Sequence, residues 1–179
     1  MLILCMLMSG GVIAYAEDAN ISDVVVTNTR DHLLVYFTVN NCFTPEMNKA
    51  IENGITTTFK FFVTLSMNRA FWWDKDVVEM QFSHTIKYDN LKEIYAVTLS
   101  EAGEKTTTVK SFEQAKKMMA DVVALKVAPL HKLFRGRTYQ LGMMTQLDKI
   151  ELPLHLHNVF FFLSLWDFET DWKMIEFRY

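Results

Sequence analysis

The sequence predicts an all-β fold, namely a β-sandwich or open barrel of eight or nine mainly antiparallel strands with two short helices. Three observations predict this class. Apolar and polar residues alternate with a period of two along most of the chain, which is typical of strands buried on one face. Short turns join successive strands, which favours an antiparallel meander. Only two segments have both helix-capping residues and the apolar spacing of a helix.

The longest alternating segment spans residues 55–88. Its first strand places these residues on one face: Ile55, Thr57, Phe59, Phe61, Val63, Leu65 and Met67. Its second strand does the same with Val78, Met80, Phe82, His84, Ile86 and Tyr88. Because both apolar faces must lie on one side of the sheet, we expect a hairpin that pairs Met67 with Val78, Phe61 with His84 and Thr57 with Tyr88.

Seven further strands are expected, two before this hairpin and five after it. They lie near residues 24–26, 33–39, 93–99, 105–110, 123–127, 139–147 and 174–179. The segment 159–165 is almost continuously apolar, which fits a buried strand or a buried helix equally well. The conformation of residues 153–172 therefore stays open at this stage.

Two helices are expected between the strands. The first begins after Thr44, which can cap it, has proline at its first position and ends near Asn53-Gly54. The second spans roughly 112–121 and follows Ser111, with Gln114 three residues later in the form of a capping box.

Residues 1–16 have the pattern of a secretory signal peptide. They are apolar and uncharged, too short for a membrane span of roughly 20 residues, and end in the small-x-small site Ala14-Tyr15-Ala16, although the usual basic segment is missing. Cleavage there leaves Cys42 as the single cysteine, which excludes an internal disulfide. We therefore expect an exported protein, periplasmic or associated with the envelope.

Composition narrows the classes of function. Residues 17–179 carry no linker or repeat, so a single β-rich domain is expected. The formal charge of −3 argues against a protein that holds nucleic acid mainly through its phosphates. The sequence contains no phosphate loop, serine nucleophile elbow or zinc signature, and we expect no cofactor.

Several motifs, in this order, resemble a known family. They are Thr44-Pro45-Glu46, residues 50–55, residues 69–74, residues 84–89, Tyr95, Tyr139, Leu147-Asp148 and Leu152-Pro153-Leu154. The family is the bacterial one known as domain of unknown function 4390, and the resemblance covers most of the chain after residue 16. It implies an exported bacterial protein with one β-rich domain, and it implies no activity. The phenylalanine-rich segment 159–168 departs from the family pattern.

The central hairpin holds the first candidate binding residues. His84 either contacts a ligand or acts as an acid or base, or it is a core histidine packed on Phe61 with one ring nitrogen bonded to backbone; the second interpretation is favoured. Trp72, Trp73 and Asp74 form either an exposed aromatic platform or a turn with one tryptophan folded over the sheet. Adjacent residues on extended backbone point in opposite directions, so we expect one buried and one exposed tryptophan. Tyr88 joins them as a candidate on the same strand face as His84.

Three weaker candidates lie elsewhere. His155 and His157 have a spacing that a metal ion could bridge on a strand, but no further ligands are evident and no metal site is predicted. Cys42 is expected to be a semi-buried free thiol rather than a reactive one. The basic segment 131–137 interleaves cations with Leu133 and Phe134. It either touches anionic lipid or an acidic partner, or is a surface loop that both apolar residues fix to the sheet, which is the favoured interpretation.

These features favour a non-catalytic interaction or binding module of the bacterial envelope, with an envelope or membrane protein as partner. The apolar strand faces supply only His84 as a titratable group, which is too little for an active site. One alternative is a carrier of a lipid or small hydrophobic ligand, with phenylalanine and methionine lining a cavity of several hundred cubic ångströms. The other is a hydrolase or metal enzyme centred on His84 or on His155 and His157.

Overall fold

The structure is a computed structural model that describes residues 18–68, 75–148 and 168–179. Nine strands form two antiparallel sheets, and two α-helices accompany them, as the sequence predicts. The three-stranded sheet has the order β1-β2-β7, formed by β1 (Asn20–Asn28), β2 (His32–Asn40) and β7 (Asp121–Pro129). The six-stranded sheet has the order β6-β5-β4-β3-β8-β9, formed by β3 (Thr57–Met67), β4 (Lys75–Asp89), β5 (Ile94–Leu99), β6 (Lys105–Val109), β8 (Thr138–Leu147) and β9 (Lys173–Arg178).

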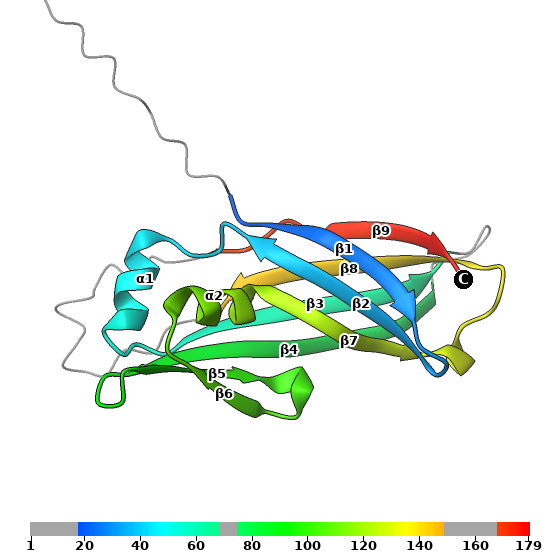
Figure 1. Cartoon of the computed structure of the whole chain (residues 1–179). Coiled ribbons are helices and arrows are strands. Elements are labelled where there is room, and N and C mark those ends of the chain that lie inside the picture. The colour runs from blue at the N-terminus through cyan, green and yellow to red at the C-terminus, as the bar shows by residue number, and fades with distance from the viewer. Residues whose placement is uncertain (1–17, 69–74, 149–167) are drawn as a thin grey trace, which may run out of the picture.

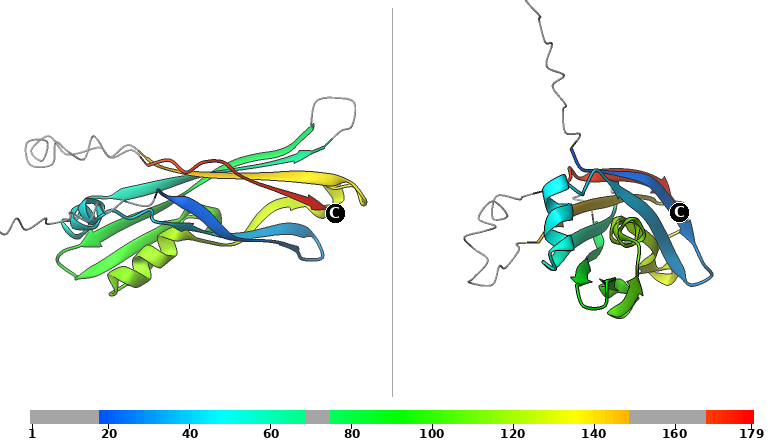
Figure 2. Two further views of the ribbon diagram at one scale, coloured as in Figure 1. Left: turned by 90° about the horizontal axis from the view of Figure 1, so that it is seen from above. Right: turned by 60° about the vertical axis from the view of Figure 1, so that its left-hand side comes forward.

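The two sheets stack as layers and share one hydrophobic core (Figures 1 and 2). The predicted meander is confirmed, because β3, β4, β5 and β6 are neighbours in space in the same order as in sequence. Phe61 of β3 lies at the centre of the core. Its ring stacks on Phe82 of β4 with centroids 4.8 Å apart, and it meets Phe37 of β2, in the other sheet, at 6.1 Å. One aromatic cluster therefore joins the two layers.

The predicted register of the central hairpin is wrong by two residues. Phe61 pairs with Phe82 rather than with His84, and Thr57 pairs with Ile86 rather than with Tyr88. Toward the turn, β4 already begins at Lys75, which pairs with Met67, so the connection is shorter than predicted. The faces are nevertheless correct, because a shift of two residues returns every side chain to the same side of the sheet.

Both helices form where their caps predict them. In α1 (Pro45–Glu52) the Thr44 hydroxyl accepts a hydrogen bond from the Met47 amide at 3.2 Å. In α2 (Phe112–Ala120) the Ser111 hydroxyl accepts from the Gln114 amide at 3.4 Å. Each cap satisfies an amide of the first helical turn, which would otherwise lack a partner. Figure 1 shows α1 at one end of the sandwich and α2 beside β5 and β7.

The sandwich is open along one side. β5 pairs with β4 only from His84 to Asp89, so the half of β4 from residue 75 to 83 has no neighbouring strand on that side among the described residues. β7 is the outer strand of the small sheet and faces this same side. The interior is therefore accessible between the edges of β4 and β7.

Candidate functional site

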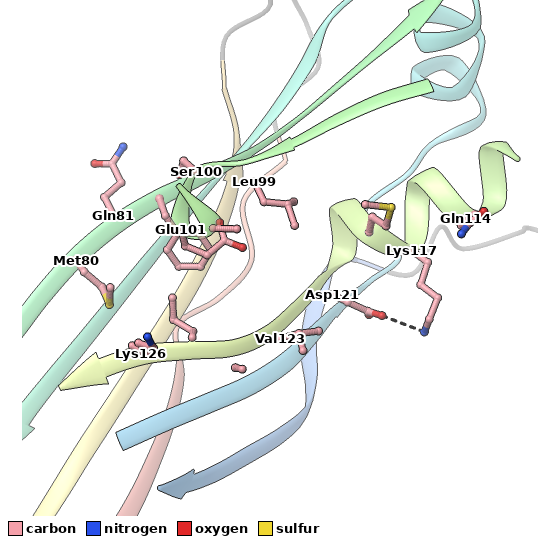
Figure 3. A pocket seen from close by; sticks show the side chains of 15 residues that line it. Met80, Gln81, Leu99, Ser100, Glu101, Gln114, Lys117, Asp121, Val123 and Lys126 are labelled. Atoms are coloured by element: carbon pink, nitrogen blue, oxygen red, sulfur yellow. Dashed lines mark ion pairs between the residues drawn. The ribbon is translucent and has the colours of Figure 1, made fainter. Parts of the chain in front are cut away.

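A groove occupies the open side of the sandwich between β4, the short 3-10 helix η1 (Ser100–Ala102), α2 and β7 (Figure 3). We call it the β4–β7 groove. Its volume of about 750 Å³ lies within the usual range for small-molecule sites. Its floor is apolar and is formed by Met80, Phe82, Leu99, Met118 and Leu125. Its rim is polar and carries Gln81, Gln114, Lys117, Asp121 and Lys126.

Local irregularities in the chain keep the groove open. After Leu99 the chain leaves the sheet through η1 and turns at Gly103, whose φ of 76° suits a residue without a side chain. In β7 the pairing with β2 shifts near Ala124, which has a φ of 55°, and Val123 stands 67% exposed. Such a bulge bends a strand and interrupts its edge. The β7 edge therefore cannot close against β4.

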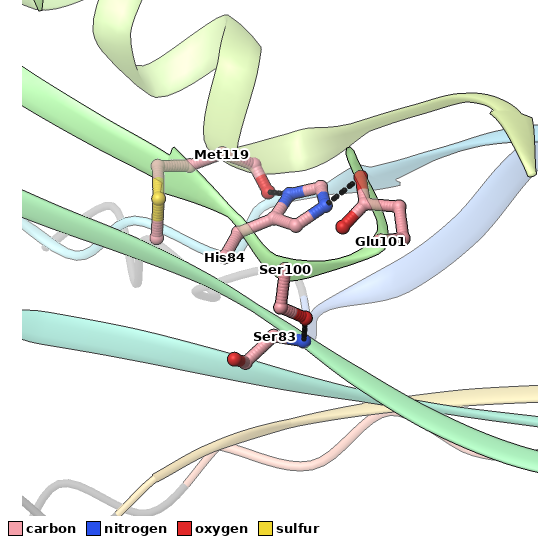
Figure 4. Close-up of polar contacts among 5 residues, drawn as sticks. All are labelled: Ser83, His84, Ser100, Glu101 and Met119. Carbon is pink, nitrogen blue, oxygen red and sulfur yellow. Dashed lines mark hydrogen bonds and ion pairs between the residues drawn. The ribbon is translucent and has the colours of Figure 1, made fainter. Parts of the chain in front are cut away.

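A buried polar pair lies behind the groove wall (Figure 4). His84 is completely buried, and its Nδ1 lies 2.9 Å from the Met119 carbonyl oxygen. Its Nε2 lies 2.9 Å from Oε1 of Glu101, which is part of the groove lining. Both ring nitrogens thus face oxygen acceptors. The Met119 carbonyl oxygen can only accept, so Nδ1 donates that hydrogen bond.

The pair fixes η1 in place. The Ser100 hydroxyl accepts a hydrogen bond from the Ser83 amide at 2.8 Å, which adds a second link between η1 and β4. The other carboxyl oxygen of Glu101, Oε2, is buried without a partner within the described structure. The groove wall therefore contains one polar atom with unused hydrogen-bonding capacity.

The structure places His84 in the core, as the favoured interpretation expects. Its ring centroid lies 4.4 Å from that of Phe61 and 5.7 Å from that of Phe82. Glu101, the partner of His84, is not among the residues predicted from the sequence. The correct register pairs His84 with Leu99, which brings the residues just after β5 over the imidazole ring. No register between β4 and β5 is predicted from the sequence, so this proximity was not apparent.

The structure describes only one of the other candidates from the hairpin, Tyr88, and it is absent from the groove lining. Trp72, Trp73 and Asp74 lie outside the described residues. Tyr88 packs on Tyr95 with ring centroids 4.6 Å apart. It lies six residues from Phe82 along β4, which corresponds to about 20 Å on a strand. Tyr88 therefore lies away from the β4–β7 groove.

Cys42 is more deeply buried than the expected semi-buried thiol. It is 3% exposed, and its thiol donates a hydrogen bond to the Val39 carbonyl oxygen at 3.3 Å. Burial raises the pKa of this thiol from 9.0 to about 12. Since the thiolate is the reactive form, this environment makes Cys42 a packing residue.

We expect Cys42 to resist thiol reagents in the folded protein. The difference between a pKa of about 12 and one of 9.0 lowers the thiolate fraction near neutral pH about a thousandfold. Folding stability should also fall as pH rises from 9.0 toward 12, because the unfolded thiol ionises first. Labelling of a Cys5→Ser variant with a chromogenic disulfide, folded and in denaturant, measures this. Equal rates in both states would contradict the assignment.

Phe134 does not fix the basic segment 131–137 to the sheet, contrary to the prediction. Leu133 is buried and fixes the loop, as predicted, but Phe134 is 61% exposed. The hydrogen bond from the Phe134 amide to the buried Tyr139 hydroxyl, at 2.8 Å, holds the backbone while the ring points outward. Only one of the two apolar residues therefore anchors this loop.

The described residues offer neither a metal site nor a membrane-spanning helix. His155 and His157 lie outside the described residues, and within the described ranges no three histidine, cysteine or acidic side chains gather as a metal site would require. None of the helices in the described ranges has the length and apolar character needed to cross a membrane.

Comparison with known proteins gives one result. No curated protein and no solved structure matches the chain. The family model described as Domain of unknown function (DUF4390) matches residues 16–176 of the 179. This match covers every described strand except the last two residues of β9. The chain therefore belongs to the DUF4390 family.

Proposed function

We propose that the protein is a non-catalytic binding module of the bacterial envelope and that the β4–β7 groove holds a small, largely apolar ligand. The groove itself carries the proposal, because it opens the apolar interior of the sandwich to solvent over about 750 Å³. Export through residues 1–16 remains part of the proposal and rests on their signal-like sequence.

The lining supports a ligand with an apolar body and a polar end. Met80, Leu99 and Met118 are only partly buried, so a ligand would remove their apolar surface from water. Methionine side chains also adapt their shape to different apolar molecules. Lys117 and Lys126 at the rim, and Glu101 in the wall, would meet the polar end.

The geometry of His84 favours binding over catalysis. An acid or base must reach the reacting group directly or through one water molecule. Both nitrogens of His84 are already engaged by Met119 and Glu101, and the ring is fully buried. His84 therefore positions the groove wall and is not exposed to a ligand.

We expect the groove to bind N-phenyl-1-naphthylamine, a neutral apolar dye, in a saturable way. The variant Val123→Glu should weaken this binding at least tenfold, because it places a charge at the apolar mouth, and tenfold corresponds to about 1.4 kcal/mol. Val123 is exposed, so the substitution should change stability little. Fluorescence titration provides the measurement.

Val25→Glu is the matched control. Val25 is an exposed valine of β1, outside the groove lining, and 54% of its surface is accessible. The control should bind the dye as the unmodified protein does. Absence of saturable binding, or equal losses in the two variants, would refute the groove as the ligand site.

A protein partner is the second candidate, and the open edge of β4 favours it. The Ser83 amide points to this edge, because it donates to Ser100 on the β5 side. The peptide groups of Gln81 and Glu79, two and four residues earlier, point the same way by strand alternation. An extended segment of a partner could pair with them by strand addition. Hydrogen exchange distinguishes the two candidates, since only an added strand would protect both amides.

A further inference from the structure

One end of the sandwich carries a cluster of cations around an exposed aromatic ring. The cluster lies where β7 ends, β8 begins and the β1–β2 turn and β9 meet them, at the end opposite α1 (Figure 1). We call this surface the cationic tip. It consists of Arg30, His131, Lys132, Phe134, Arg135, Arg137 and Arg178, all of which are exposed.

These residues come from three separate segments and form one continuous surface. Arg30, His131 and Arg135 line the same shallow hollow. His131 also lines the adjoining hollow with Lys132 and Phe134. The Arg178 guanidinium lies 3.8 Å from the position that a Cβ atom at Gly136 would occupy. Tertiary structure thus adds Arg30 and Arg178 to the basic segment of the sequence.

The charge of the tip is positive on balance. Three acids lie at this end: Asp31 beside Leu130, Asp76 in the hollow with Phe134, and Glu176, which precedes Arg178 by two residues on β9. Among the described residues, the ion pairs involve lysines at other places and His84, and none includes an arginine. Five permanent cations therefore face solvent here against three acids, although the whole chain has a net charge of −3.

The loop that carries Phe134 is held by its own hydrogen bonds. The Tyr139 hydroxyl accepts from the Phe134 amide at 2.8 Å, and the Phe134 carbonyl accepts from the Arg137 amide at 3.3 Å. The Gly136 amide donates to the Tyr179 carbonyl, and the Tyr179 amide donates to the Arg137 carbonyl at 3.1 Å. The loop thus presents a large apolar ring to water on a fixed backbone.

We propose that the cationic tip docks on the surface of an anionic phospholipid bilayer, with Phe134 entering the headgroup region. Cations next to an anionic bilayer each contribute about 1 kcal/mol, which is about fivefold in affinity. An apolar ring flanked by arginine and lysine is the side-chain combination that binds at such an interface. The tip lies at one end of the molecule, where the ends of several strands meet.

Co-sedimentation with vesicles tests the proposal. The protein should bind vesicles of phosphatidylcholine with one third phosphatidylglycerol and should be released by high salt, since the charges are exposed. It should not bind vesicles of pure phosphatidylcholine. Arg135→Gln combined with Arg137→Gln should weaken binding about 25-fold, which is fivefold for each cation. Phe134→Ala should weaken it about tenfold, because the ring no longer enters the interface.

Lys105→Gln combined with Lys110→Gln is the matched control. It removes the same charge from exposed residues in and just after β6, away from the tip, and should leave binding within twofold. The proposal would be overturned if the protein did not bind anionic vesicles, or if both double variants lost binding equally. Binding to soluble polyglutamate provides a second test. The proposal would also be overturned if polyglutamate bound as tightly as the vesicles, required the arginines and bound Phe134→Ala equally well, because that result would assign the tip to an acidic protein.

The vesicle-binding test of the cationic tip is independent of the dye-binding test of the β4–β7 groove. Val123→Glu should bind anionic vesicles as the unmodified protein does, since Val123 lines the groove and not the tip. Phe134→Ala should bind the dye normally. Failure of one proposal therefore does not carry over to the other.

Discussion

Replacement of His84 by alanine is expected to lower the free energy of unfolding by about 3–5 kcal/mol. The substitution removes a ring packed on Phe61 and Phe82 and leaves a cavity in the core. It also removes the hydrogen-bond partner of the Met119 carbonyl and of the Glu101 carboxyl group, which are held at 2.9 Å in the native protein. Unsatisfied buried polar groups cost free energy in addition to lost packing. Urea denaturation followed by circular dichroism measures the loss.

Variants of Glu101 separate the packing effect from the polar one. Glu101→Ala should cost about 1–3 kcal/mol, because one imidazole nitrogen loses its partner. Glu101→Gln should cost less than about 1 kcal/mol, since an amide can donate to a neutral ring. The expected order of destabilisation is therefore His84→Ala, Glu101→Ala, Glu101→Gln. A His84→Ala protein as stable as Glu101→Gln would show that the buried pair is unimportant to the fold.

Replacement of Phe61 by alanine is expected to cost a similar 3–5 kcal/mol. Its ring is completely buried and joins the two sheets through Phe37 and Phe82. No neighbouring element can move in to fill the space without separating paired strands, so the cavity should persist. Thermal and chemical denaturation of the variant test this expectation.

Two controls accompany Phe61→Ala. Phe61→Leu keeps most of the volume and should cost about 1–1.5 kcal/mol. Phe134→Ala removes an equally large ring from an exposed site and should change stability by no more than about 0.5 kcal/mol. Equal losses at Phe61 and Phe134 would mean that the centre of the core has been assigned to the wrong residues.

Much of the fold could be predicted from local patterns. The caps at Thr44 and Ser111 specify both helices, because a side-chain hydroxyl can satisfy a first-turn amide without any tertiary contact. Alternation specifies which face of each strand is buried, since successive side chains point to opposite sides. The last strand, β9, was predicted in the same way, from alternation over residues 174–179.

The register of the central hairpin could not be predicted. Burial of the apolar face allows pairings that differ by two residues, because each keeps the same side chains inside. The choice depends on how far β4 extends toward the turn and on a bulge between Leu65 and Ser66. The contact between His84 and Glu101 depends instead on the pairing of β4 with β5, for which local alternation gives no register.

The two candidate surfaces differ in how much of each could be predicted from the sequence. The basic segment 131–137 is evident in sequence, but its partners Arg30 and Arg178 join it only when the ends of five strands meet. The β4–β7 groove has no counterpart in any local pattern. It exists because β4 is longer than β5 and because β7 is bulged where it pairs with β2.

The motifs of the sequence identified the family to which the chain belongs. The sequence by itself also determined the fold class, the two helices and the buried faces of the central strands β3 and β4. These properties follow from interactions between residues close in sequence and from the period of the strand. Only the tertiary structure decided the strand register, the burial of Cys42, the His84–Glu101 pair, the groove and the full cationic tip. Each of these depends on segments far apart in the chain, and their mutual position is set by packing of the whole core.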